Sequence, residues 1–91
     1  MARVVITLNI MPESPDVDLG EVLSAAKKDL EKFKAVFMRV EEEPVAFGLK
    51  ALKLTFSVDE KGGDTEPLEE KIKTIEGVQS VEVISASRGL G

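Results

Sequence analysis

Two segments of the chain alternate between apolar and mostly polar side chains, and this alternation limits the possible folds more than any other feature. The segments span residues 3–10 and 51–58. A period of two is that of a β-strand, because successive side chains point to opposite faces of a sheet. The apolar positions are Val4, Ile6, Leu8 and Ile10 in the first segment and Leu52, Leu54, Phe56 and Val58 in the second. The sequence therefore predicts a sheet with one buried face.

Two other segments have the spacing of amphipathic helices. The first begins at Asp18, which can cap the helix in a box-like pairing with Glu21. The second is capped by Asp64 or Thr65 and ends at Gly77, which suits the left-handed residue that follows many helices. The apolar faces consist of Leu19, Val22, Leu23, Ala26, Leu30 and Phe33 in the first helix and of Leu68, Ile72 and Ile75 in the second.

Two further strands are predicted at residues 35–43 and 78–85. A connection at residues 44–48 joins the earlier of them to the strand at 51–58. Residues 87–91 follow the last strand and contain two glycines, so we expect a tail with little to hold it. The inward-facing residues of these two strands are predicted to be Val36, Met38 and Val40 and, near the C-terminus, Val81 and Val83.

The order strand, helix, strand, strand, helix, strand predicts an α+β fold of the ferredoxin-like plan, a four-stranded antiparallel sheet with both helices on one face. Right-handed crossovers place the first strand between the third and the fourth. We expect one domain over residues 1–91. The predicted core is Val4, Ile6, Leu8, Leu23, Leu30, Leu54, Phe56, Ile72, Ile75 and Val83. The open face of the sheet is predicted to carry Val5, Thr7, Arg39, Lys53, Thr55 and Ser57.

Composition excludes several classes of function. The chain has no Cys and no His, which excludes thiolate and imidazole catalysis and zinc sites built on those residues. We therefore expect no enzyme of the hydrolytic kind, no cofactor and no metal of its own. The net charge of −5 disfavours nucleic-acid binding and suits a basic protein partner. No apolar run is long enough to span a membrane, and no signal-peptide block precedes the first strand, so a cytoplasmic location is expected.

The connection between the second and third strands contains Phe47 next to Gly48. Connections run over the surface and are usually polar, so a large aromatic residue is unexpected there. Phe47 is therefore a candidate anchor for a partner protein. The alternative is that its side chain folds back onto the edge of the core.

Three segments resemble archaeal translation elongation factor one-beta and, more distantly, the exchange domain of its eukaryotic counterpart. They are Glu43–Leu52, Met11–Asp18 and Gly77–Val83. The resemblance spans nearly the whole chain. It implies a guanine nucleotide exchange factor that acts without covalent chemistry on the GTPase elongation factor one-alpha, which delivers aminoacyl-tRNA to the ribosome.

The resemblance also implies which residues bind the partner. Phe47, with Gly48 and Lys50 of the same motif, would contact the GTPase, and the Phe would lodge in a pocket of it. A basic residue near the C-terminus of the eukaryotic relatives reaches toward the magnesium site, and Arg88 occupies that position here. The family has Lys at this place and a shorter end, so the alternative for Arg88 is a solvated charge on a tail.

Two other function classes share the predicted fold. A small-metabolite-binding regulatory domain would need a polar pocket at a dimer edge. An acylphosphatase-like enzyme would need an Arg in the loop after the first strand, but residues 11–18 are acidic, proline-rich and without Arg. The enzyme is therefore disfavoured, and the regulatory domain is the alternative to the exchange factor.

Overall fold

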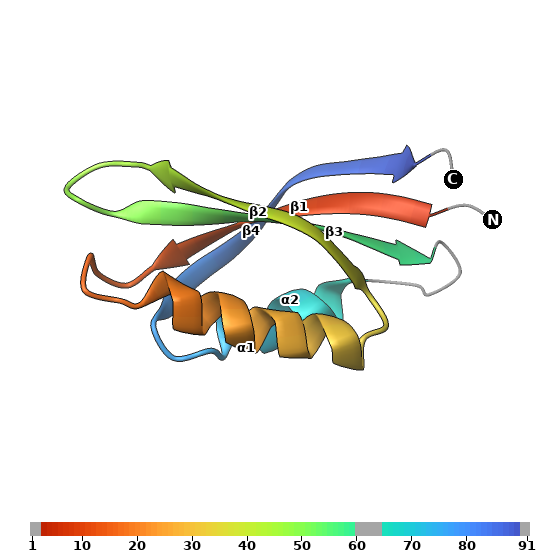
Figure 1. Cartoon of the computed structure of the whole chain (residues 1–91), viewed down its shortest axis with the longest axis horizontal. Helices are drawn as coiled ribbons and strands as arrows, with labels where there is room; N and C mark the ends of the chain where they lie inside the picture. Colours follow the sequence, from red (N-terminus) through yellow and green to blue (C-terminus); the bar gives the residue numbers. More distant parts are fainter. Residues whose placement is uncertain (1–2, 60–64, 90–91) are drawn as a thin grey trace.

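A four-stranded sheet covered on one face by two helices makes up the fold, which the computed structural model describes for residues 3–59 and 65–89 (Figure 1). The elements are β1 (Arg3–Pro12), α1 (Leu19–Lys32), β2 (Val36–Pro44), β3 (Lys50–Asp59), α2 (Glu66–Lys73) and β4 (Val78–Gly89). The strands are antiparallel in the order β2-β3-β1-β4. The predicted ferredoxin-like plan is confirmed, and β1 lies between β3 and β4 as expected.

The core lies between the two central strands and the helices. Leu8 pairs with Leu54 across the β1–β3 ladder, and both side chains are 0% exposed. The predicted core residues that are buried are Ile6, Leu8, Leu30, Leu54, Phe56 and Ile72. The remaining ones, apart from Val83, are half-buried against this cluster and are Val4, Leu23 and Ile75. Full burial of a side chain as large as Phe56 contributes about 1.5–3 kcal/mol to stability.

Val83 is a wrong core prediction, because its side chain is 38% exposed. It pairs with Leu8 and so shares the inner face, but β4 is an edge strand with a neighbour on one side only. The register also shifts there, since Thr7 pairs with Ser85 and leaves Ile84 as an extra residue in β4.

The C-terminal residues correct a second prediction. Residues 87–89 do not form a tail, since Ser87, Arg88 and Gly89 continue β4 and pair with β1. Antiparallel pairing with a central strand holds this backbone in place. The last two residues of the expected tail lie outside the described part of the chain.

The β2 strand faces the core differently from the prediction. Phe37 pairs with Phe56 and Val40 with Leu54, and a register shift between these pairs makes Met38 an extra residue. Val36 and Met38 are consequently 53% and 52% exposed, whereas Phe37, which lies between them in the sequence, packs against the core. Val40 packs against the core as predicted. The Lys27 ammonium lies 4.4 Å from the centre of the Phe37 ring, a cation–π contact between α1 and β2.

The face of the sheet away from the helices is open, as predicted (Figure 1). Two of the residues assigned to it, Thr55 and Ser57, are nevertheless buried. They lie on the inner strand β3, where neighbouring side chains cover short hydroxyl groups. The Oγ1 atoms of Thr7 and Thr55 are 3.1 Å apart, and the Arg3 Nε–H donates to Ser57 Oγ at 3.1 Å. The hydroxyl groups are thereby satisfied.

The helices begin where the sequence predicts. The Gly20 N–H donates to Asp18 Oδ1 at 2.9 Å, which caps α1. Thr65 occupies the cap position of α2 but makes no capping bond with its side chain, and Asp64 lies outside the described residues. Within residues 3–59 and 65–89, neither helix is long and apolar enough to cross a membrane.

The loop between β1 and α1 is fastened to the turn before β4. The Glu13 N–H donates to the Gly77 carbonyl oxygen at 2.9 Å. Gly77 has a φ of +93°, and a Cβ at this position would lie 2.8 Å from Val17 Cγ1. Gly77 is therefore required both for its backbone conformation and for the close approach of Val17.

We expect Gly77→Ala to lower the free energy of unfolding by more than Gly48→Ala does. Gly48 also has a positive φ, +78°, but the nearest atoms to a Cβ there lie 3.8 Å away. Left-handed backbone costs about 1–2 kcal/mol in both variants, and overpacking against Val17 adds about 1–3 kcal/mol at Gly77 alone. Urea denaturation measures the difference, and equal losses in the two variants would contradict the close packing of Val17.

Candidate functional site

The turn between β2 and β3 holds its two central residues in left-handed backbone. The Val45 N–H donates to the Leu49 carbonyl oxygen and the Leu49 N–H to the Ala46 carbonyl oxygen, both at 2.9 Å. Phe47 has a φ of +55° and Gly48 a φ of +78°. Tight hairpin turns with two positive φ values prefer Asn or Gly. For a bulky side chain such as that of Phe47 this conformation costs about 1–3 kcal/mol.

The side chain of Phe47 is 94% exposed. Each of the other large apolar side chains that is exposed in the described residues is 54% exposed or less. Phe47 therefore does not fold back onto the core edge, which was the alternative. Val45, at 54%, adds a second apolar surface on the same turn, which the sequence analysis did not single out. The sequence signal that indicates Val45 is an apolar residue in a connecting segment, where polar residues are usual.

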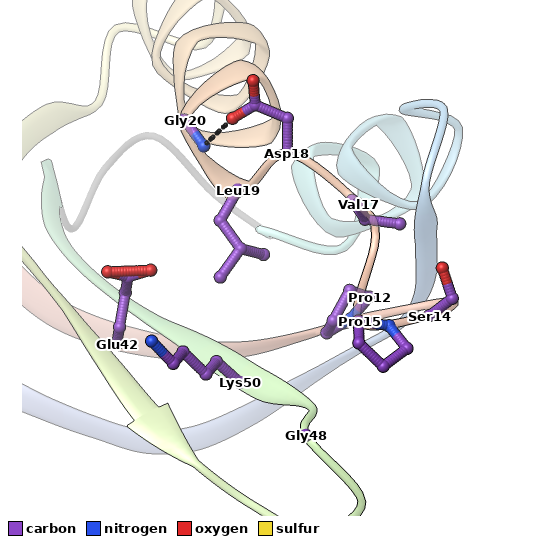
Figure 2. Close-up of a pocket in the computed structure, with 10 residues that line it drawn as sticks. All are labelled: Pro12, Ser14, Pro15, Val17, Asp18, Leu19, Gly20, Glu42, Gly48 and Lys50. Atoms are coloured by element: carbon purple, nitrogen blue, oxygen red, sulfur yellow. Dashed lines mark hydrogen bonds between the residues drawn. The ribbon is translucent and has the colours of Figure 1, made fainter.

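A cleft of about 480 Å³ separates this turn from the loop that precedes α1 (Figure 2). Gly48 and Lys50 line one side, and Pro15 and Leu19 lie across from them. The side chain of Lys50 extends toward Glu42, which also lines the cleft (Figure 2). Glu42 and Lys50 take no part in the ion pairs Glu43–Lys53 and Glu70–Lys73 of the described residues.

The structure brings Phe47, Gly48 and Lys50 together but not Arg88. Arg88 and Val58 both pair with Val4, at the end of the sheet opposite the turn (Figure 1). At about 3.3 Å of rise per residue, the part of β3 from Lys50 to Val58 spans about 26 Å. The candidate residues therefore lie in two separate places on the sheet rather than in one site.

Comparison with known proteins assigns the family. The sequence matches the model of the EF-1 guanine nucleotide exchange domain over residues 5–88. The chain belongs to this family. It is 49% identical over 88 residues to elongation factor 1-beta of Methanobrevibacter smithii, covering 97% of this chain and 98% of that protein. It is 44% identical over 87 residues to elongation factor 1-beta of Methanoregula boonei, with 96% and 98% covered.

Two solved structures share the fold. One is the ACT domain from GTP pyrophosphokinase of Chlorobium tepidum, with a TM-score of 0.60, 17% identity, and 88% of this chain and 96% of that chain covered. The other is the C-terminal domain of the MgtC protein from Mycobacterium tuberculosis, with a TM-score of 0.63, 11% identity, and 96% and 87% covered. At these identities the likeness concerns the fold alone.

The family decides between the function classes that the sequence left open. The predicted resemblance to archaeal elongation factor one-beta is confirmed, and the chain is an exchange factor of translation elongation. Membership of this family implies a non-catalytic role in guanine nucleotide exchange.

We expect Phe47→Asn to raise the free energy of unfolding by about 1 kcal/mol, because Asn tolerates the left-handed conformation that strains Phe47. Phe56→Ala is the control in the core and should lower it by about 3–5 kcal/mol. Urea denaturation measures both. A loss of stability in Phe47→Asn would mean that the Phe47 side chain makes stabilising contacts in the free chain.

Proposed function

We propose that this chain promotes the release of GDP from the GTPase elongation factor one-alpha and that Phe47 is its anchor on that partner. The observation that carries the proposal is the 94% exposure of Phe47 on a turn with positive φ. An exposed aromatic ring and a strained backbone are both unfavourable in the free chain. Both are offset when a partner pocket buries the ring, since burial contributes about 1.5–3 kcal/mol.

Gly48 and Lys50 act beside the anchor. Gly48 supplies the second positive φ of the turn without strain, so the ring of Phe47 is held away from the sheet. Lys50 is exposed and follows the turn in sequence, so its ammonium group can form a charge-assisted hydrogen bond with a carboxylate of the partner.

Arg88 makes a second contact, at the magnesium and phosphate site of the GTPase. Guanine nucleotides bind through phosphates and a Mg²⁺ ion that needs near-ideal octahedral coordination. A guanidinium group near the ion would repel it by several kcal/mol even at an effective dielectric constant of about 20. Coupling between two ligands is reciprocal, so returning nucleotide and Mg²⁺ would displace the exchange factor.

The edges of the sheet, like the family, disfavour the alternative, a metabolite-binding domain that dimerises edge to edge. Register shifts interrupt the pairing of both edge strands, between Phe37 and Arg39 in β2 and between Val83 and Ser85 in β4. Such irregularities hinder the addition of another strand to an edge.

The proposal is tested by the release rate of fluorescent GDP from archaeal elongation factor one-alpha with and without the chain. We expect the rate to rise with the concentration of the chain and to saturate. An unchanged rate at saturating concentrations would contradict the proposed function.

We expect Phe47→Ala to weaken binding to the GTPase by about 2–4 kcal/mol, the range of a central interface anchor, while the melting temperature stays nearly unchanged. Titration calorimetry measures the affinity. Phe33→Ala is a matched control, because Phe33 is a second exposed Phe, at 40%, and lies at the end of α1 away from the turn. Equal losses of affinity in both variants would contradict a specific role for Phe47.

We expect Arg88→Gln to slow GDP release while leaving affinity for the GTPase mostly unchanged. Arg88→Lys should keep most of the activity if charge is what acts on the metal, and lose it if the planar guanidinium makes the contact. Excess Mg²⁺ should slow GDP release more with the unmodified chain than with Arg88→Gln, since only the unmodified chain competes with the ion by charge. Stopped-flow measurements over a range of Mg²⁺ concentrations test this, and equal inhibition of both would contradict the role of Arg88.

A further inference from the structure

The turn that carries Phe47 projects beyond the packed part of the molecule. Every residue from 41 to 48 is exposed, and the helices do not cover this end of the hairpin (Figure 1). A hairpin end of this kind is held by its own hydrogen bonds, here those of Val45 and Leu49, and by whatever lies against it. Without an outside support it would sway relative to the sheet.

Pro15 lies close to the turn. Gly48 has no Cβ, but a Cβ at this position would lie 3.8 Å from both Cβ and Cγ of Pro15, so the proline ring is the nearest surface to Gly48 on that side. Pro15 and Gly48 also line the same cleft (Figure 2). The proline ring is a rigid surface next to Gly48, the residue that follows Phe47 in the chain.

The loop that carries Pro15 is itself fixed at several points. On one side of Pro15 the Glu13 N–H is bound by the Gly77 carbonyl oxygen. On the other side Val17 packs against Gly77, and Asp18 caps α1. Within the loop the Val17 N–H donates to the Ser14 carbonyl oxygen at 3.3 Å. The position of the proline ring is therefore set by the body of the molecule and not by the hairpin.

We infer that Pro15 is a positioning residue that holds the Phe47 turn in its partner-binding orientation, an inference that rests on the proposed function. By limiting the sway of the hairpin toward α1, Pro15 reduces the conformational freedom that Phe47 loses on binding. Preorganisation of this kind raises affinity without adding a contact to the partner. Pro15 acts through Phe47, and its removal matters only while Phe47 is present.

The test compares Pro15→Gly and Pro15→Ala with Pro67→Ala. Pro67 is an exposed proline of α2, and α2 does not line the cleft. We expect both Pro15 variants to raise the concentration for half-maximal GDP release from elongation factor one-alpha about three- to tenfold, with the maximal rate unchanged. Hydrogen exchange at the Val45 and Leu49 amides should quicken about fivefold in these variants. Pro67→Ala should change neither quantity.

A double-mutant cycle with Phe47→Ala separates positioning from direct contact. In the Phe47→Ala background, Pro15→Gly should have no further effect on the half-maximal concentration. An equal effect in both backgrounds would mean that Pro15 touches the partner and would overturn the inference. The inference would also be overturned by Pro15 variants that behave like Pro67→Ala while Phe47→Ala still weakens binding.

If Phe47→Ala itself has no effect, the proposed function fails at its anchor, and the amide exchange still reports whether Pro15 restrains the turn. If Pro15→Gly lowers the melting temperature, Pro15→Ala provides the same comparison with the Cβ retained.

Discussion

The pairing of β1 with β3 under the two helices is the constraint on which the rest of the structure depends. Leu8 and Leu54 face each other across this pair and are wholly buried, with Leu30 of α1 and Ile72 of α2 in the same core. The two helices do not cover the end of the β2–β3 hairpin, where residues 41–48 are all exposed (Figure 1). The residues of the proposed Phe47 contact thus lie where the core makes few demands, so substitutions there can change binding with little cost in stability.

At Phe47 the residue type disagrees with the preferences of its local structure, and the proposed partner contact accounts for this. Asn or Gly would suit a φ of +55°, and a polar residue would suit 94% exposure, yet a Phe satisfies neither preference. Sequences generally agree with their folds at every level, and exceptions gather at working sites. The free-energy cost of this strain is small compared with the stability contributed by burial of the core, which is why the fold can hold Phe47 in this conformation.

Sequence patterns predicted the regular elements well and the irregular ones poorly. The alternation in β1 and β3 identified Ile6, Leu54 and Phe56 as core, because a straight strand keeps its period of two. In β2 and β4 an extra residue, Met38 or Ile84, breaks that period without a recognisable sequence signal. The location of Phe47 on a turn was predictable from its neighbours, but its exposure was not. The contacts of Pro15 and Gly77 depend on tertiary packing between segments far apart in the chain.

The continuous sheet also sets how the two proposed contacts can cooperate. β1 is hydrogen-bonded to β3 and β4 along its length, so the Phe47 turn and the backbone of Arg88 are separated by about 26 Å of paired strand. A partner that engages both must present two sites at that spacing. Because the paired strands between the two contacts are stiff, binding energy gained at Phe47 can hold Arg88 at its proposed contact on the partner. Binding at Arg88 alone would be too weak to keep it there. Energy from a remote contact can in this way support an unfavourable step at the other end, which in the proposed function is the displacement of a metal ion.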